Sequence, residues 1–248
     1  MHSLLLAFTA LLNQLVGAPV TALLNKFGIQ PMHPTHPIGN GLALELLVAG
    51  GLILFFIAVR ASLSVEKPGS VQHMAEMVYG FVDDQAKSVM GEHGYETHLS
   101  FVTTILLFVL ICNLLGLLPG IPTPTADTVV PLGIALVTFV YYNWHGVRAQ
   151  GPIGYLKHFM GPIWWIAPLM FPIEIISNLA RVMSLTVRLY ANMLASDLLT
   201  LVFFSLVPIG IPIIFLGLHL GVALIQAYVF MLLAMIYLGE ATAHQESH

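Results

Sequence analysis

Charge is scarce in this chain of 248 residues: only 8% are Asp, Glu, Lys or Arg, whereas 58% are hydrophobic. This composition, with a mean hydropathy of +0.89, excludes a water-soluble globular domain and indicates an all-α polytopic membrane protein. Cysteine is almost absent too. The single Cys112 excludes a disulfide framework and a CxxC motif, and we interpret it as a small buried hydrophobic residue.

Catalytic and nucleotide-binding motifs are missing as well. The sequence has no HExxH zinc motif, no GxSxG elbow and no P-loop, so it indicates neither a membrane hydrolase nor an ATP-binding protein. It lacks the duplicated halves that are typical of secondary transporters, which leaves that class as the weaker alternative. We therefore expect no enzyme activity in the chain by itself, no cofactor, no metal site and no nucleic-acid partner.

Apolar segments predict about five transmembrane helices, because a bilayer core requires roughly 20 helical residues. Three of them are residues 41–59, 98–118 and 127–144, and the other two form a C-terminal hairpin over residues 173–240. The first leg of the hairpin, 173–206, would be about 51 Å long at 1.5 Å per residue, against a hydrocarbon core of roughly 30 Å. We therefore expect the hairpin to be strongly tilted.

The segments outside these helices set the orientation. Residues 65–94 mix charged and apolar side chains as an amphipathic surface helix does, and residues 1–40 read as a periplasmic or interfacial segment before a single transmembrane domain, 41–248. Five basic residues fall on one side of the membrane, which the positive-inside rule makes cytoplasmic, so the N-terminus lies outside and the C-terminus inside. The five are Arg60, Lys67, Lys87, Arg148 and Lys157, against Lys26 on the other side.

A permanent cation, Arg188, stands inside the apolar hairpin, where an ionisable residue is a functional hypothesis by default. Counting seven back gives Arg181, seven more gives Glu174, and four forward gives Asn192. At 100° per residue these four side chains lie on one stripe of the helix, whereas Asp197, nine residues beyond Arg188, faces the opposite side.

The second leg of the hairpin carries a matching pair of polar residues. His219 and Gln226 are seven residues apart on one helical face, after a break at 208–212 that contains two prolines and a glycine. If the legs are antiparallel about residue 207 or 208, Gln226 falls opposite Arg188 and His219 falls opposite Asp197. One turn position thus predicts both pairings.

Three motifs resemble a known family. They are Arg-Leu-Tyr-Ala-Asn-Met at 188–193 with Asp197 beyond it, Gln-Ala-Tyr-Val-Phe-Met-Leu-Leu at 226–233, and Asn-Leu-Leu-Gly-Leu-Leu-Pro at 113–119. Together they resemble subunit a of the F-type ATP synthase, from about residue 40 to the C-terminus. The resemblance implies the stationary, non-catalytic proton-translocating subunit of the Fo sector, in the inner membrane of a bacterium. The implied partners are the c-subunit ring, the b subunits of the peripheral stalk, the remaining synthase subunits and the lipid bilayer.

The resemblance also implies roles for individual residues. Arg188 corresponds to the essential arginine that faces the carboxylate of the c-ring, where it favours the ionised carboxylate and repels a proton passing directly between the two sides. Protons must then travel by way of the ring, through two offset half-channels. The candidate pathway residues are Asn192 and Gln226 beside the arginine, Asp197 and His219 on the outer side, Glu174 and Ser177 on the cytoplasmic side, and Asn113 and Asp127 near the outer surface.

Other interpretations stay open. Arg188 could form an internal ion pair with Glu174 or Asp197, and Arg181 could be a structural pair, an interfacial residue or part of the channel. His219 could be an interhelical hydrogen-bonding residue. Asn113 and Asp127 could cap helix ends instead of lining a channel. The sequence leaves sodium coupling as an alternative to proton coupling, because the ion is bound by the ring.

Overall fold

The computed structural model describes residues 2–26, 39–61, 63–64, 69–91, 94–118, 121, 123–160, 165, 167–206 and 210–242. Every regular element in this part of the chain is helical, which confirms the predicted all-α class. The elements are α1 (His2–Lys26), α2 (Asn40–Ala61), α3 (Ser70–Met90), α4 (Glu96–Leu115), the 3₁₀ helix η1 (Pro124–Ala126), α5 (Val129–Met160), α6 (Ala167–Leu206) and α7 (Ile211–Thr242).

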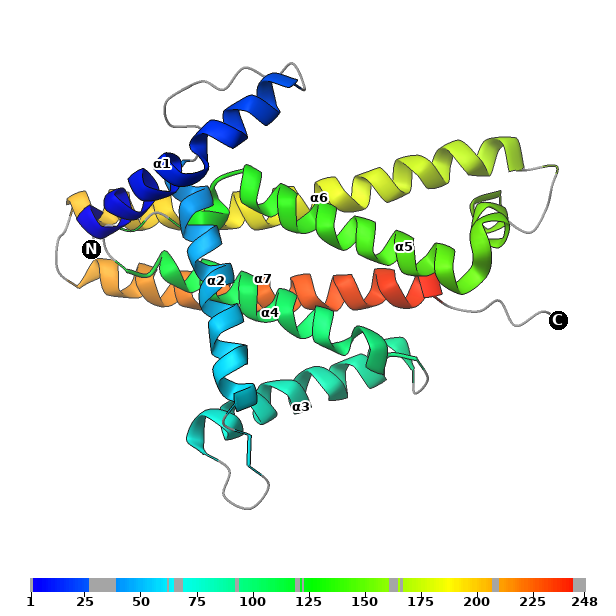
Figure 1. Ribbon diagram of the computed structural model, residues 1–248, viewed down its shortest axis with the longest axis horizontal. Coiled ribbons are helices and arrows are strands. Elements are labelled where there is room, and N and C mark those ends of the chain that lie inside the picture. Colours follow the sequence, from blue (N-terminus) through cyan, green and yellow to red (C-terminus); the bar gives the residue numbers. More distant parts are fainter. Residues whose placement is uncertain are drawn as a thin grey trace.

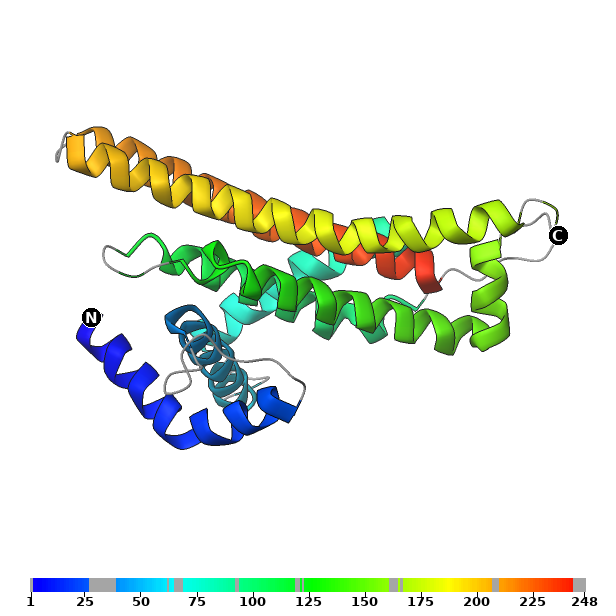
Figure 2. The same cartoon turned by 90° about the horizontal axis from the view of Figure 1, so that it is seen from above.

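Helices α4 to α7 form two layers. Figure 2 shows α6 and α7 side by side in one layer, with α4 and α5 in the layer below them. Contacts connect the layers, since α5 packs on both α6 and α7, and α4 packs on α7. Helix α2 crosses this stack at a steep angle, with α1 near one of its ends and α3 near the other (Figure 1). If α2 stands along the membrane normal, the long hairpin is therefore strongly inclined.

Among the described residues, four helices are long and apolar enough to cross a membrane: α2, α4, α6 and α7. They include four of the five predicted spans. The remaining segment, 127–144, is the first part of α5, which falls outside this set because Asn143, His145 and other polar residues dilute its apolar character. Helix α5 also continues beyond the predicted end at residue 144, to Met160. Only Gly151, at φ 75°, interrupts it, and this kink separates two helical segments.

The long helix of the hairpin begins earlier than we predicted. The prolines near its start predict a beginning at Ile173, whereas α6 begins at Ala167 and contains Pro168 and Pro172. Pro168 lies in the first turn, where the backbone N–H that proline lacks has no helical acceptor. Pro172 lies within the following turn, where it removes one helical hydrogen bond without ending the helix.

Two peripheral helices agree with the sequence. Helix α3 has the amphipathic pattern predicted for 65–94, although it is shorter, and residues 65–68 with Lys67 lie outside the described residues. Helix α1 begins the segment 1–40, of which residues 27–38 are likewise outside the description. Cys112 is fully buried and packs with Val48 and Leu52 where α2 crosses α4, as expected for a small hydrophobic residue.

Candidate functional site: polar residues along a membrane hairpin

Close packing fixes the position of the α6–α7 hairpin. Leu189 and Met193 on α6, and Phe230 and Met231 on α7, are almost completely buried in one continuous core shared with α4 and α5. Lipid tails are as apolar as these side chains, so van der Waals contact rather than exclusion from water favours the packed state. Fully buried Ala227 lets the backbones approach, and the polar residues of the hairpin are thereby held in fixed places.

Arg188 is half-buried, and within the described residues it forms no ion pair. Its Nη2 donates a hydrogen bond to Ser184 Oγ at 3.3 Å, one turn back on the same helix. Neither Glu174 nor Asp197 pairs with it, so the interpretation of Arg188 as half of an internal ion pair is wrong. The guanidinium remains a cation without a carboxylate in this part of the molecule.

Arg181 has the opposite environment. Its Nη1 lies 2.9 Å from Glu240 Oε2, its Nη2 donates to Glu240 Oε1 at 3.2 Å, and its guanidinium carbon lies 4.9 Å from the ring centroid of Tyr237. Both partners belong to the C-terminal part of α7. Of the alternatives left open for Arg181, the structure supports the structural pair, which ties the two legs together far from the hairpin tip.

The middle of the hairpin is joined by an amide pair. Asn192 Nδ2 donates to Gln226 Oε1 at 3.0 Å. The predicted pairing of Gln226 with Arg188 is therefore off by about one helical turn. The reason lies at the hairpin tip: α6 ends at Leu206 and α7 begins at Ile211, so the turn is centred slightly later than we assumed. A groove of about 290 Å³ between the legs is lined by both amide residues.

Asp197 faces away from that seam, as predicted, and meets His219. Asp197 Oδ1 lies 3.5 Å from His219 Nδ1 and accepts a hydrogen bond from Thr123 Oγ1 at 2.8 Å. His219 is only 1% exposed, whereas the Asp197 side chain is 28% exposed. The pair therefore connects an accessible carboxylate with a buried imidazole.

Asn113 extends this group into a cluster of Asn113, Thr123, Thr125, Asp197 and His219, which we call the outer cluster after the side on which the sequence predicts it to lie. The backbone carbonyl of Asn113 lies 3.3 Å from His219 Nε2, and the Asn113 side chain accepts from Thr125 Oγ1 at 2.6 Å. Its Nδ2 donates to the Ala223 carbonyl at 3.4 Å. Asn113 is completely buried, so it is an interhelical bridge in the cluster and not an exposed helix cap.

Sequence reasoning missed the two threonines. Thr123 directly precedes the 3₁₀ helix η1 and Thr125 lies within it, and both are buried although threonine is mostly exposed in proteins. The available signal was two hydroxyl residues on either side of Pro124. Gly116 is part of the same arrangement, because a Cβ there would lie 1.8 Å from Thr123 Oγ1. The site requires glycine at this position.

Asp127 lies apart from the outer cluster. It is exposed, and its Oδ1 accepts a hydrogen bond from the backbone N–H of Val129 at 3.4 Å at the start of α5. Of the two alternatives, the structure supports the helix cap. Its other oxygen points toward α2, where a Cβ on Gly41 would come within 3.2 Å of it.

The part of the molecule far from the hairpin tip carries further polar contacts. Glu174 and Ser177 are half-buried on α6, and next to them Tyr142 on α5 donates a hydrogen bond to Asn178 Oδ1 at 2.8 Å. Burial raises the pKa of Tyr155 beyond the kink of α5, opposed by the charge of Arg181 and reinforced by that of Glu174. The phenol therefore stays protonated as a hydrogen-bond donor.

Fold and site define the class of protein: a multi-pass helical membrane protein with polar and ionisable side chains along one long hairpin. Comparison with known proteins identifies the family. The sequence model of the family described as ATP synthase A chain matches residues 43–239. The chain therefore belongs to the family of ATP synthase subunit a, a membrane subunit of the Fo sector.

Individual relatives agree with this assignment. The chain is 56% identical over 237 residues to ATP synthase subunit a of Koribacter versatilis, with 96% of each chain covered. It is 45% identical over 219 residues to the subunit of Solibacter usitatus, covering 88% of this chain and 94% of the relative. With the subunit of Sulfurimonas denitrificans it shares 39% identity over 202 residues, covering 82% and 90%.

Proposed function

We propose that this chain is the stationary subunit through which protons reach and leave a rotating ring of c subunits, with Arg188 as the electrostatic gate. One observation carries the proposal: the half-buried Arg188 has no carboxylate partner among the described residues. A cation at the centre of a bilayer costs about 2.5–3.5 kcal/mol even on the insertion scale. A carboxylate supplied by another subunit would offset this cost and would itself be held in its ionised form.

The surface next to Arg188 suits a partner helix. Five exposed residues follow one face of α6 at spacings of three and four, and none of them is larger than valine. They are Ala180, Ser184, Val187, Ala191 and Ala195. Small side chains let a neighbouring helix approach closely within a membrane. A ring helix lying on this face would bring its carboxylate within reach of the guanidinium.

The outer cluster supports a role in proton uptake. The Asn113 carbonyl can only accept, so a hydrogen bond to it requires the proton on His219 Nε2. The other ring nitrogen, Nδ1, then faces the Asp197 carboxylate, and a proton between these two groups can be held by either of them. Asp197 is the more accessible member, so the pair would pass protons from the outer surface toward the buried imidazole.

Glu174 and Ser177 would line the path on the cytoplasmic side. The orientation required is an external N-terminus, a cytoplasmic C-terminus and α3 on the cytoplasmic surface, which agrees with α1 and α3 at opposite ends of α2 (Figure 1). The c-ring and the b subunits of the peripheral stalk would be the direct partners in the bacterial inner membrane.

The test compares two arginines in the assembled complex. ATP-driven proton pumping is measured in inverted vesicles for Arg188→Gln and for the matched control Arg181→Gln, together with ATP hydrolysis and the amount of assembled complex. We expect Arg188→Gln to abolish pumping in normally assembled complex, and Arg181→Gln to retain most of it per assembled complex. Normal pumping by Arg188→Gln would refute the gate.

A further inference from the structure

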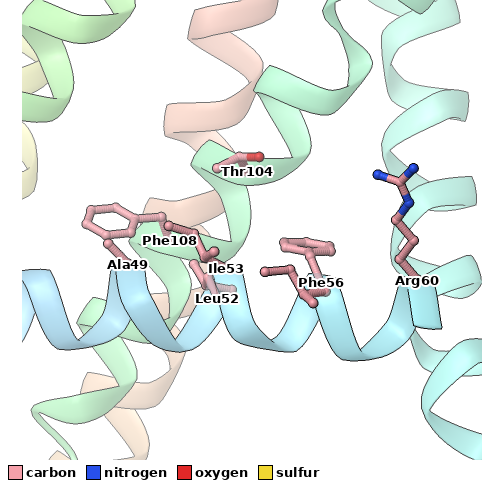
Figure 3. Close-up of a pocket in the computed structure, with 8 residues that line it drawn as sticks. Ala49, Leu52, Ile53, Phe56, Arg60, Thr104 and Phe108 are labelled. Atoms are coloured by element: carbon pink, nitrogen blue, oxygen red, sulfur yellow. The ribbon is translucent and has the colours of Figure 1, made fainter. Parts of the chain in front are cut away.

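The steep crossing of α2 over α4 leaves a groove on each side of the contact. One of them, of about 450 Å³, is lined by apolar side chains of α2 and by Thr104 and Phe108 of α4, and it ends at Arg60. Figure 3 shows Phe56 and Arg60 extending from the same side of α2, with Phe108 and Thr104 on the crossing helix. The Thr104 hydroxyl donates to the Ser100 carbonyl of its own helix, so the groove wall is apolar up to the guanidinium.

We propose that this groove binds one phospholipid with an anionic headgroup from the cytoplasmic leaflet, its acyl chain along α2 and its phosphate on Arg60. The length of the groove matches the depth of one membrane leaflet. From Ala49 to Arg60 the helix rises about 16 Å, roughly half of a 30 Å hydrocarbon core and therefore the depth of one leaflet. Arg60 ends α2 on the side that the distribution of basic residues makes cytoplasmic.

Charge distinguishes this groove from its neighbour. A larger groove of about 720 Å³ lies between α2, α3 and α4, and its polar lining includes Glu76, whose carboxylate accepts a hydrogen bond from Gln72 at 2.7 Å. That edge would repel an anionic headgroup. Arg60 is exposed, and no carboxylate in the described part of the chain pairs with it. Arginine is well suited to a phosphate, since its planar fork donates two parallel hydrogen bonds.

The lining favours a lipid over a partner helix, because it is apolar along α2 and ends at a single exposed cation. A single acyl chain can follow a narrow wedge between crossing helices. Arg60 takes no part in the proposed proton path, so the lipid site and the gate can fail independently.

The experiment places p-benzoylphenylalanine at position 56 of the full chain, within the assembled complex in nanodiscs of equal phosphatidylglycerol and phosphatidylcholine. After irradiation, the mass of the adduct identifies what occupies the groove. We expect lipid adducts with phosphatidylglycerol favoured about fivefold, the factor that corresponds to about one basic residue near a membrane surface. The preference should vanish in Arg60→Gln, return in Arg60→Lys and persist in Arg148→Gln, an exposed cation on α5 outside the groove.

A reference position defines ordinary contact with the bilayer. Val140 lines a groove on α5 whose other lining residues are Leu136, Val137, Tyr141 and Trp144, all of them uncharged. The same probe at position 140 should capture both lipids equally. The proposal is overturned by equal capture of the two lipids at position 56, by a preference that survives in Arg60→Gln, or by a protein adduct in place of lipid.

Discussion

Arg181 and Arg188 are one heptad apart on the same helix and have opposite environments. Arg181 is held by both oxygens of Glu240 and lies over the Tyr237 ring. Among the described residues, Arg188 has a hydroxyl, Ser184 Oγ at 3.3 Å, and no carboxylate partner. Position on a polar stripe therefore does not tell a paired cation from an unpaired one. The presence or absence of a nearby carboxylate makes this distinction, because a cation that already has an ion-pair partner is a poor partner for a second carboxylate.

The largest expected effect comes from making Arg188 resemble Arg181. In Ser184→Glu the new carboxylate lies four residues before Arg188, the favourable order for a helical ion pair. At about 4 Å and an intermediate dielectric such a pair gains about 4 kcal/mol, so it would compete with the ring carboxylate. We expect about a hundredfold loss of ATP-driven pumping, measured in inverted vesicles, with the arginine still present.

The uncharged variant Ser184→Gln is the matched control, because it adds similar bulk without a carboxylate. We expect it to retain much more pumping than Ser184→Glu, because it adds bulk to the small-residue face without pairing Arg188. Equal losses in the glutamate and glutamine variants would show that bulk on the small-residue face of α6, and not the pairing of Arg188, causes the defect.

A smaller effect is expected at the outer cluster, which holds a carboxylate without an arginine. Asp197→Leu removes the accessible carboxylate that would take up the proton, and it leaves the buried Thr123 hydroxyl without its acceptor, a loss worth about 1–3 kcal/mol. Passive proton conduction, measured in membranes stripped of the soluble sector, should fall about tenfold in consequence. The exchanged pair, Asp197→His with His219→Asp, should recover part of the loss.

Gly116→Ala tests the same cluster without changing a polar group, since its methyl would displace Thr123 from Asp197. Its conduction should fall in the same direction, and by less than that of Asp197→Leu. If Asp197→Leu and His219→Leu both conduct like the parent, the cluster is structural packing.

The two ends of the hairpin also show what sequence can predict. Helical periodicity placed Asp197 opposite His219 and turned it away from Arg188, because both statements require only a helix of 3.6 residues per turn and one hairpin. The same reasoning placed Gln226 opposite Arg188 instead of Asn192, one helical turn away, because it assumed a hairpin tip centred at residue 207 or 208. It could not find Thr123 or Thr125, whose positions depend on how a proline-containing loop folds between α4 and α5.

The ion pair of Arg181 could not be predicted from the sequence either, because it also depends on long-range packing. Its partner Glu240 is fifty-nine residues away in the chain, and this contact depends on the crossing of two long helices. Composition predicted most of the helix boundaries, with two exceptions. Helix α6 begins earlier than predicted, at Ala167, because it continues through two prolines. Helix α5 ends later than predicted, at Met160. Apolar content predicts which segments enter the membrane, whereas long-range packing decides which polar residues meet.

A moderate effect on stability should distinguish the paired arginine from the free one. Arg181→Ala leaves Glu240 without its cation, and Arg181→Ala with Glu240→Ala removes both charges. For a partly exposed pair we expect a coupling energy of about 1 kcal/mol, measured by a double-mutant cycle on the thermal or denaturant unfolding of the purified chain in detergent. Pumping per assembled complex should change little in either variant. A coupling energy of zero would place Arg181 among the cations without a specific partner.

The smallest effect on proton conduction is expected for a solvent-exposed ion pair. On the surface helix α3, Lys87 Nζ donates to Asp83 Oδ2. This hydrogen bond lowers the pKa of Asp83 and raises the pKa of Lys87. The contribution of Asp83 is complete above its ordinary pKa and is lost as pH falls through its lowered value, whereas that of Lys87 is complete below its ordinary pKa and is lost as pH rises through its raised value. The pair is therefore fully charged between about pH 5 and pH 9.

Asp83→Asn should accordingly leave the pH profile of passive proton conduction unchanged over that range, because neither member of the parent pair titrates there. Conduction by stripped membranes at half-unit steps of pH checks this expectation, with Asp197→Asn measured in parallel as the variant that should alter the profile. If Asp83→Asn shifts the profile as much as Asp197→Asn does, carboxylates on the surface helix also supply protons to the path. The distinction between a partnered cation and a free one would then not be sufficient to locate the proton pathway.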